Sequence, residues 1–472
     1  MENKTSGEIA KQQAERRTKP DIGNLGNCIK DIKKAALDND PGPKDPTNYS
    51  KLRGRLESSR EKLPPLYRKN VFEPFTKELG NLGQEGFSQI LLDDPRREMA
   101  AGLMMDIAHS ILQNGEGYNE KATDSFQEVI SDLYAGFLSA EDRKGVKLPD
   151  KGAIPPLVKW GNPNSGPYTW PVDATSNFGL HTAIVNLPPA NSRGGLLAWA
   201  ALGHETAGHD ILHADTGLSQ EMANAVYTSL HDQNIGHNLP EYWAIRIDET
   251  ASDVLGILNM GPSAAIGLIG FFRGLNFAYS GEAKLRNEGP EKDPHPADIL
   301  RGYLASYTVN MLSFSGSADW AKIIDAETDR DLSTILIQEE EVDAQEAKNS
   351  ARIVAKTLIK AKMKSLDNHH LGEIQNWRNR DETVVKKLRN VLTMAGDLPT
   401  QFASGIYAAH VVAAAVVESV SKNADIPMLF DRMIGMLKIM HDSNPSWGPL
   451  YVVHPGDIVA LPAYYNHKEK LE

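Results

Sequence analysis

Residues 196–213, LLAWAALGHETAGHDILH, contain the most informative pattern in the sequence. Apolar residues recur there at helical spacing, so the pattern predicts one helix over these residues. Its last turns carry three histidines and two carboxylates, at His204, Glu205, His209, Asp210 and His213. Burying several ionisable groups among leucine and alanine is costly unless a metal ion or charged partners compensate. The sequence therefore predicts a metal site on this helix.

A zinc site that activates water needs neutral imidazoles on the metal and a nearby carboxylate that takes the proton. His204 and His209 can supply the imidazoles, and Glu205 can supply the carboxylate. At about 100° per residue, two histidines five positions apart diverge by about 140° around an ideal helix. A single-turn π-bulge near Gly208 would turn both toward one ion. An undistorted helix would instead align Glu205, His209 and His213, which is a rival ligand set.

The six residues 204–209, HETAGH, resemble the His-Glu-x-x-Gly-His motif of dipeptidyl peptidase III, a zinc metallopeptidase family of the gluzincin type. In that family a second helix presents a glutamate as the third zinc ligand. Residues 248–253, DETASD, are similar to that second segment. The resemblance implies that Glu249 is the third ligand of one Zn²⁺ per chain. It also implies that Asp253 orients a ligand histidine, and we expect Asp210 and His213 to support the ligands from behind.

Residues 295–301, HPADILR, are similar to the His-Pro…Arg segment that follows the glutamate helix in membrane-linked CAAX-type zinc proteases. This similarity implies that His295, Arg301 or nearby Tyr303 donates a hydrogen bond to the oxyanion that develops when water attacks a carbonyl. We therefore expect His295 and Tyr303 among the catalytic residues.

A short apolar run at residues 182–187, TAIVNL, predicts a strand just before the metal helix. Pro188 and Pro189 follow it, which is typical of an edge strand. Zincins keep an edge strand at this place, where it pairs with an extended substrate. Residues 144–171, rich in Gly, Pro and Asn, predict a long irregular connection and a domain boundary.

The remaining pattern predicts a mainly α-helical protein with a small β element next to the metal-binding helix. The resemblance implies that this part is a zincin-like core. The breaker cluster DNDPGP at residues 38–43 predicts that ordered structure begins after it. The uncharged residues 254–272 contain Gly261-Pro262, so they predict two short buried helices rather than a membrane span. The predicted parts are a poorly ordered N-terminal segment (residues 1–50), a helical N-terminal domain (51–150), a zincin-like metal-binding domain (151–325) and a helical C-terminal domain (326–472).

Composition narrows the possible partners and metals. The 472 residues include 50 Lys and Arg against 62 Asp and Glu, a net charge of -12 that repels phosphate backbones, so nucleic acid is excluded as a partner. The single cysteine, Cys28, cannot form a thiolate metal site, so a metal must bind to His, Asp and Glu. The polar N-terminus lacks the apolar stretch of a secretory signal, from which we expect a cytoplasmic location.

These features together predict a zinc-dependent hydrolase that cleaves peptide or amide bonds. His204, His209 and Glu249 would hold the metal. Glu205 would act as general base and then pass the proton to the leaving amine.

Two other interpretations stay open. The His209-Asp210 pair resembles the His-Asp pair of HD-type metal-dependent phosphohydrolases, in which His181 and either Asp248 or Asp253 would complete the metal site. The other alternative is a non-catalytic helical binding protein in which the motif is accidental.

Overall fold

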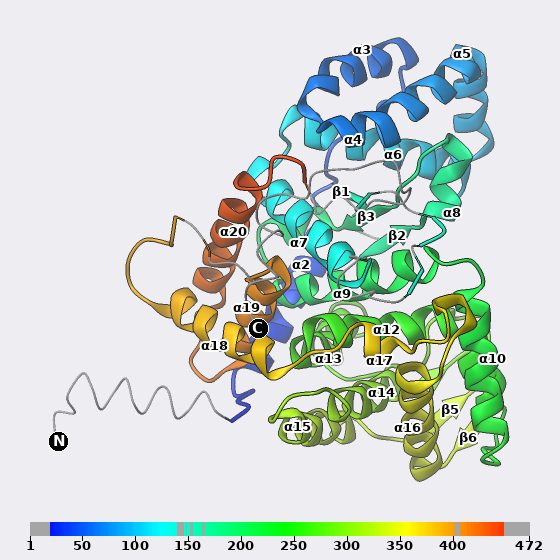
Figure 1. Cartoon of the computed structure of the whole chain (residues 1–472), viewed down its shortest axis with the longest axis vertical. Coiled ribbons are helices and arrows are strands. Elements are labelled where there is room, and N and C mark those ends of the chain that lie inside the picture. Colours follow the sequence, from blue (N-terminus) through cyan, green and yellow to red (C-terminus); the bar gives the residue numbers. More distant parts are fainter. Residues whose placement is uncertain are drawn as a thin grey trace.

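The computed structural model describes residues 19–138, 146–147, 149–151, 154–162, 166–400, 402 and 406–447. It is mainly helical with small sheets, as the sequence predicts (Figure 1). The α-helices are α2 Leu25–Ala36, α3 Tyr49–Ser59, α4 Pro65–Tyr67, α5 Glu73–Asp93, α6 Ala100–Glu116, α7 Glu120–Leu138, α8 Val172–Thr175, α9 Ala201–His204, α10 Leu218–His231, α11 Leu239–Ile245, α12 Ile247–Met260, α13 Pro262–Tyr279, α14 Asp298–Asn310, α15 Ser317–Asp329, α16 Ala344–Lys360, α17 Leu371–Ile374, α18 Asn379–Thr393, α19 Ala408–Val420 and α20 Ile426–Asp442. The strands are β1 Leu157–Trp160, β2 Tyr168–Trp170, β3 Ile184–Leu187, β4 Glu288–Gly289, β5 Ile335–Ile337 and β6 Glu340–Val342.

The sheet next to the metal helix has the strand order β1-β3-β2, with β1 parallel and β2 antiparallel to β3. The predicted strand at residues 182–187 therefore exists, but its prediction as an edge strand is wrong because β3 is the central strand. Its neighbours β1 and β2 come from the segment predicted to be an irregular connection. Strands of three and four residues among Gly, Pro and Asn carry too little alternation to be recognised. The prolines after β3 lead into a short 3₁₀-helix, Pro189–Ser192.

Helix α2 corrects the prediction that ordered structure begins after residue 43. Four of its residues, Leu25, Cys28, Ile29 and Ile32, are buried on one face. This face packs against α13 and is part of the main core. Their i, i+3, i+4, i+7 spacing is typical of a helix. The pattern is only two turns long and lies between a charged segment and a breaker cluster, so the helix was not predicted. Residues 1–18 of the predicted N-terminal segment lie outside the described residues.

The uncharged segment at residues 254–272 forms parts of two helices, as predicted. Helix α12 ends at Met260 and α13 begins at Pro262. Gly261 between them has a φ of 62°, which glycine adopts without strain. Among the helices of the described residues, none combines the length and apolar character that crossing a membrane needs.

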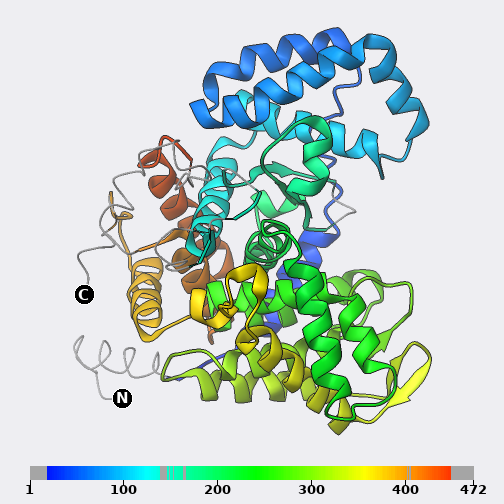
Figure 2. The ribbon, with the colours of Figure 1, turned by 45° about the vertical axis from the view of Figure 1, so that its right-hand side comes forward.

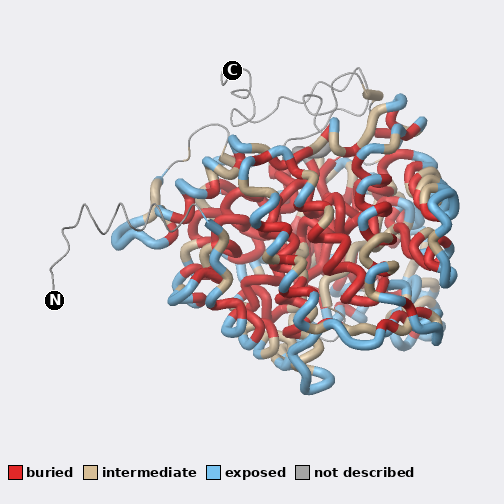
Figure 3. Tube along the Cα trace, turned by 90° about the horizontal axis from the view of Figure 1, so that it is seen from below, coloured by how far each residue is buried: buried red, intermediate tan, exposed pale blue. Residues whose placement is uncertain are grey.

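Two hydrophobic cores describe the packing of the chain. One hydrophobic core contains residues from Leu25 to Met440, and the buried parts of the chain are continuous in Figure 3. A second core lies among the N-terminal helices, which form a layer of their own above the sheet (Figure 2). The sheet separates the two cores because Leu157 and Ile184 face one while Val158 and Val185 face the other. The boundary predicted at residues 325/326 falls inside α15.

Glu128 on α7 provides a prediction for the pH dependence of stability. Burial, reinforced by nearby Asp132, raises its pKa to about 8 from an ordinary value of 4.5. The folded protein therefore retains a proton that the unfolded chain loses, and stability falls as the pH rises between these two values. Glutamine is always neutral and can still accept the hydrogen bond from Asn444 Nδ2. We expect Glu128→Gln to raise Tm by several degrees at about pH 9 and to have little effect at about pH 5.

Differential scanning calorimetry at both pH values tests this prediction. Glu120→Gln is the matched control, because Glu120 is exposed on the same helix. His441 Nδ1 lies 3.8 Å from Glu128 Oε2, but burial lowers the pKa of this imidazole to about 4, so it is neutral in the folded protein at both pH values. A Tm difference that is the same at both pH values would contradict the prediction.

Candidate metal centre

The helix that carries the HETAGH motif changes twice in its backbone hydrogen-bonding pattern. The chain runs from a 3₁₀-helix at Leu196–Ala200 through α9 into a π-helix at Glu205–Asp210. The predicted bulge is therefore present, at the predicted place. A π-helix has one more residue in its turn than an α-helix, so it places two side chains five positions apart on the same face.

The π-helix brings two imidazoles together with a carboxylate of α12. Ligand atoms of His204, His209 and Glu249 all lie within 4.8 Å of one another. The two histidine Nε2 atoms are 3.0 Å apart. His204 Nε2 is 3.2 Å from Glu249 Oε2, and His209 Nε2 is 3.4 Å from Glu249 Oε1. Tetrahedral zinc with bonds of about 2.0–2.1 Å places its ligand atoms about 3.3 Å apart. The three side chains are thus close enough together to bind one metal ion.

The charge of Glu249 suits a cation. Burial raises its pKa, but contacts with the two histidines and the charge of Arg301 outweigh burial and lower the pKa overall. Glu249 is therefore an anion. Its buried Oε2 lies 3.2 Å from His204 Nε2 and 3.6 Å from Arg301 Nη2, but neither contact has the geometry of a hydrogen bond. A buried carboxylate oxygen that lacks a well-formed hydrogen bond is costly, and a bound cation would lower this cost.

Close packing between two helices creates this geometry. Helix α12 packs against α9 and the π-helix near the centre of the molecule (Figure 1). A Cβ atom at Gly208 would lie 2.3 Å from Ser252 Cβ, so only glycine allows this approach. One turn earlier a Cβ at Gly203 would lie 3.2 Å from Gly256 Cα. Glycine in the motif therefore lets the Glu249 helix approach the histidines.

A buried aspartate, itself paired with an arginine, contacts the His204 imidazole. Its Nδ1 is 2.8 Å from Asp253 Oδ1, so Nε2 faces His209 and Glu249. Arg301 Nε and Nη2 donate to the Asp253 carboxylate over 2.7 and 2.8 Å, and Asp253 is fully buried. The structure thus places Asp253 where the sequence predicts it, and Arg301 lies behind Asp253.

Asp248 performs the same task for His209. Its Oδ2 is 3.3 Å from His209 Nδ1, and its Oδ1 is 3.3 Å from His213 Nε2. His213 Nδ1 in turn is 3.2 Å from Asp173 Oδ2 on α8. His213 is therefore connected to His209 through Asp248. Asp248 was named from the sequence only as a possible ligand in the phosphohydrolase interpretation. Its position directly before Glu249 could have indicated that it lies near the histidines.

Asp248 leads to a prediction about metal affinity. We expect Asp248→Asn to weaken zinc binding about 10–100-fold, because an amide supports the bound imidazole of His209 less well than a carboxylate. Competition with a chromophoric zinc chelator measures this change. Asp232→Asn, at an exposed position, is the control and should bind zinc as the unmodified chain does. Equal affinities in all three proteins would mean that Asp248 does not orient His209.

The candidate base, Glu205, lies on the π-helix and is 5% exposed. Thr169 Oγ1 donates a hydrogen bond of 2.8 Å to Glu205 Oε2. Thr169 is the middle residue of β2, the edge strand that packs against the π-helix. Since β2 was not predicted, sequence reasoning missed Thr169.

The structure brings His295 to the centre. This residue lies in the loop before α14, and its Nε2 is 3.5 Å from Glu249 Oε1. Its Nδ1 is 3.0 Å from Asp293 Oδ1, and about half of the side chain is exposed. His295 can therefore reach both the cluster and solvent.

The structure does not bring Tyr303 to the centre. Its hydroxyl donates to Asp329 Oδ1 over 2.9 Å, at the end of α15. Arg301 and Tyr303 are two positions apart on α14, so their side chains point about 200° apart around the helix. Because Arg301 faces α12, Tyr303 faces α15 and cannot stabilise an oxyanion at the cluster.

Asp210 does not support the ligands either. Its carboxyl is buried, Oδ2 has no hydrogen-bond partner among the described residues, and burial raises its pKa to about 7. The group of potential ligands in the described chain contains neither Asp210 nor His181, which is exposed. Adjacent helical residues point about 100° apart, so His209 and Asp210 face different surroundings. The phosphohydrolase ligand set is not assembled.

Comparisons with protein-family models, with curated proteins and with solved structures gave no match.

Proposed function

We propose that this chain is a zinc-dependent hydrolase that cleaves peptide or amide bonds. The observation that carries the proposal is the convergence of His204 Nε2, His209 Nε2 and a Glu249 oxygen within 4.8 Å. The other nitrogen of each histidine faces an aspartate, which is the usual arrangement behind metal-bound imidazoles. Glu205, which directly follows a ligand in the chain, supplies the carboxylate that hydrolysis requires.

The residues divide the chemistry between them. His204, His209 and Glu249 would hold Zn²⁺, which would supply a Lewis acid that polarises a carbonyl and lowers the pKa of water to about 7. Glu205 accepts a proton from the attacking water and delivers it to the leaving nitrogen. Thr169 holds the Glu205 carboxylate in place during both transfers. His295 donates a hydrogen bond to the carbonyl oxygen as its negative charge develops.

Strand β2 suggests how a peptide is held. Among the described strands it pairs only with β3, so its other edge can pair with an extended chain. Main-chain hydrogen bonds to such an edge are independent of sequence and align the peptide backbone. Thr169 ties this edge directly to Glu205, which places a paired peptide bond beside the base.

Metal content tests the proposal most directly. We expect about one zinc per chain in the purified protein after incubation with zinc and removal of excess metal. His204→Ala and Glu249→Ala should each contain almost none, because two ligands hold zinc far more weakly than three. Inductively coupled plasma mass spectrometry measures the ratio. His231→Ala is the control, because this histidine is exposed on α10.

Each alternative has its own outcome. Two metals per chain that are lost in Asp210→Ala would favour the phosphohydrolase. If the unmodified chain binds no zinc, the interpretation as a non-catalytic binding protein is the one that remains. Zinc that is retained in both His204→Ala and Glu249→Ala would show that the metal binds elsewhere.

A further inference from the structure

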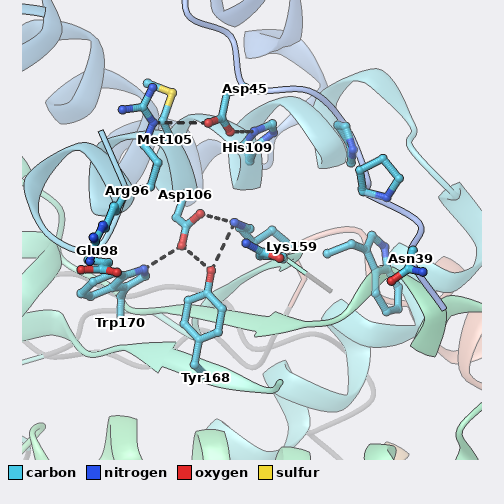
Figure 4. Close-up of a pocket in the computed structure, with 17 residues that line it drawn as sticks. Asn39, Asp45, Arg96, Glu98, Met105, Asp106, His109, Lys159, Tyr168 and Trp170 are labelled. Atoms are coloured by element: carbon cyan, nitrogen blue, oxygen red, sulfur yellow. Dashed lines mark hydrogen bonds and ion pairs between the residues drawn. The ribbon is translucent and has the colours of Figure 1, made fainter. Parts of the chain in front are cut away.

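A large cavity lies on the opposite side of β2 from the metal centre. Its volume is about 730 Å³, and it is lined by α6, by residues between Asn39 and Asp45, and by the ends of β1 and β2 (Figure 4). Successive side chains of a strand point to opposite faces. Thr169 therefore contacts Glu205, while Tyr168 and Trp170 line the cavity. The cavity is distinct from the metal centre, and its volume is typical of a small-molecule site.

The cavity has a buried polar floor. Asp106 accepts hydrogen bonds from Tyr168 over 2.6 Å, from Trp170 Nε1 over 2.8 Å and from Lys159 Nζ. Lys159 is only 4% exposed, an unusual degree of burial for lysine. Its ammonium has three N–H donors, and its acceptors among the described residues are Asp106 and, at 3.5 Å, Tyr168. At least one donor is thus left for a ligand that presents an acceptor to the floor.

The rim carries one free charge of each sign. Arg96 and Glu98 are exposed at the rim, and neither side chain has an ion-pair partner within the described part of the chain. Asp45, also on the rim, is paired with His109 and Arg97. The lining has three cationic and three carboxylate side chains: Arg96, Arg97 and Lys159, and Asp45, Glu98 and Asp106. These charges balance, although the whole chain has a net charge of -12.

We propose that this cavity binds a small zwitterion, namely a free amino acid or a dipeptide with both termini charged. The ligand carboxylate meets the spare donor of Lys159 and the guanidinium of Arg96, and its ammonium group meets Glu98. A simple anion such as phosphate would meet the carboxylates of Glu98 and Asp45 without a compensating charge of its own. A neutral sugar would form no ion pair with Arg96 or Glu98, so it would gain less from these two side chains than a zwitterion does. The charges of the lining therefore favour a zwitterion over both.

Isothermal titration calorimetry with alanylalanine tests the proposal. All titrations use the Glu205→Gln chain, so that the dipeptide is not consumed at the metal centre. We expect alanylalanine to bind and N-acetyl-alanylalanine amide, which lacks both charges, not to bind. Arg96→Gln and Glu98→Gln should each weaken binding about tenfold or more, because each removes a charge-assisted hydrogen bond. Both side chains are exposed and unpaired, so neither variant threatens folding.

Matched controls locate the site. Arg53→Gln on α3 and Glu85→Gln on α5 change exposed charges away from the cavity lining and should leave binding unchanged. Three results would overturn the proposal: no heat from alanylalanine, equal binding of the neutral amide, or unchanged binding in both rim variants. Tighter binding of inorganic phosphate or of maltose than of alanylalanine would also overturn it, in favour of an anion or a sugar. None of these outcomes depends on zinc or on hydrolysis.

Discussion

Glu205→Gln is expected to lower kcat by about a thousandfold or more and to leave zinc binding intact. Glutamine has nearly the shape of glutamate but cannot accept a proton at neutral pH. It can still accept the hydrogen bond from Thr169, so the π-helix and the ligands should keep their positions. The loss would therefore fall on the chemical step rather than on the fold or the metal.

The measurement combines two readouts on the same preparations. Cleavage of a mixed peptide library, followed by mass spectrometry, gives the activity, and elemental analysis gives the zinc content. Thr169→Val is a graded companion, because it removes only the bond that orients the base, and it should lose about tenfold. Full activity in Glu205→Gln would exclude Glu205 as the base. Loss of zinc in this variant would instead make Glu205 a ligand, as in the rival set of an undistorted helix.

Gly208→Ala is expected to destabilise the protein by about 1–3 kcal/mol and to weaken zinc binding more than tenfold. The new methyl group would lie 2.3 Å from Ser252 Cβ and 2.5 Å from Ser252 Cα, so α12 would have to move. Glu249 lies less than one helical turn from Ser252 and would move with it. One substitution should thus affect both the free energy of unfolding and the metal affinity.

Chemical denaturation and chelator competition measure the two effects. Gly54→Ala on α3 is the control, because a Cβ there meets no atom within 4 Å and alanine favours a helix. Adding Ser252→Gly to Gly208→Ala removes the contact with Ser252 Cβ but not that with Cα, so it should restore part of both losses. Unchanged zinc affinity in Gly208→Ala would show that close packing of the two helices does not position Glu249.

Several features of the centre could be predicted because they depend on local spacing. Histidines five positions apart can share an ion only across a bulge, and the π-helix at Glu205–Asp210 provides it. Asp253 follows Glu249 by one helical turn, so both lie on the same face of α12. Nothing in these inferences needs knowledge of which other segments are nearby.

Other features could not be predicted because they depend on contacts between distant segments. Thr169 is 36 positions before Glu205 and reaches it through a three-residue strand that has no clear pattern. Tyr303 was selected for its proximity in sequence to Arg301, but the neighbours of α14 decide which of the two faces the centre. The helix at Leu25–Ala36 is marginal by itself and is stabilised by burial against α13.

The sequence alone determined the helical class, the two histidines with their required bulge, and the glutamate helix, because helical periodicity is a property of consecutive residues. Only the tertiary structure decided that β3 is central and β2 is the edge, that Asp248 faces His209, and that a charged cavity adjoins the same strand. These features arise from packing between segments far apart in the chain, where burial and shape rather than local spacing select the neighbours.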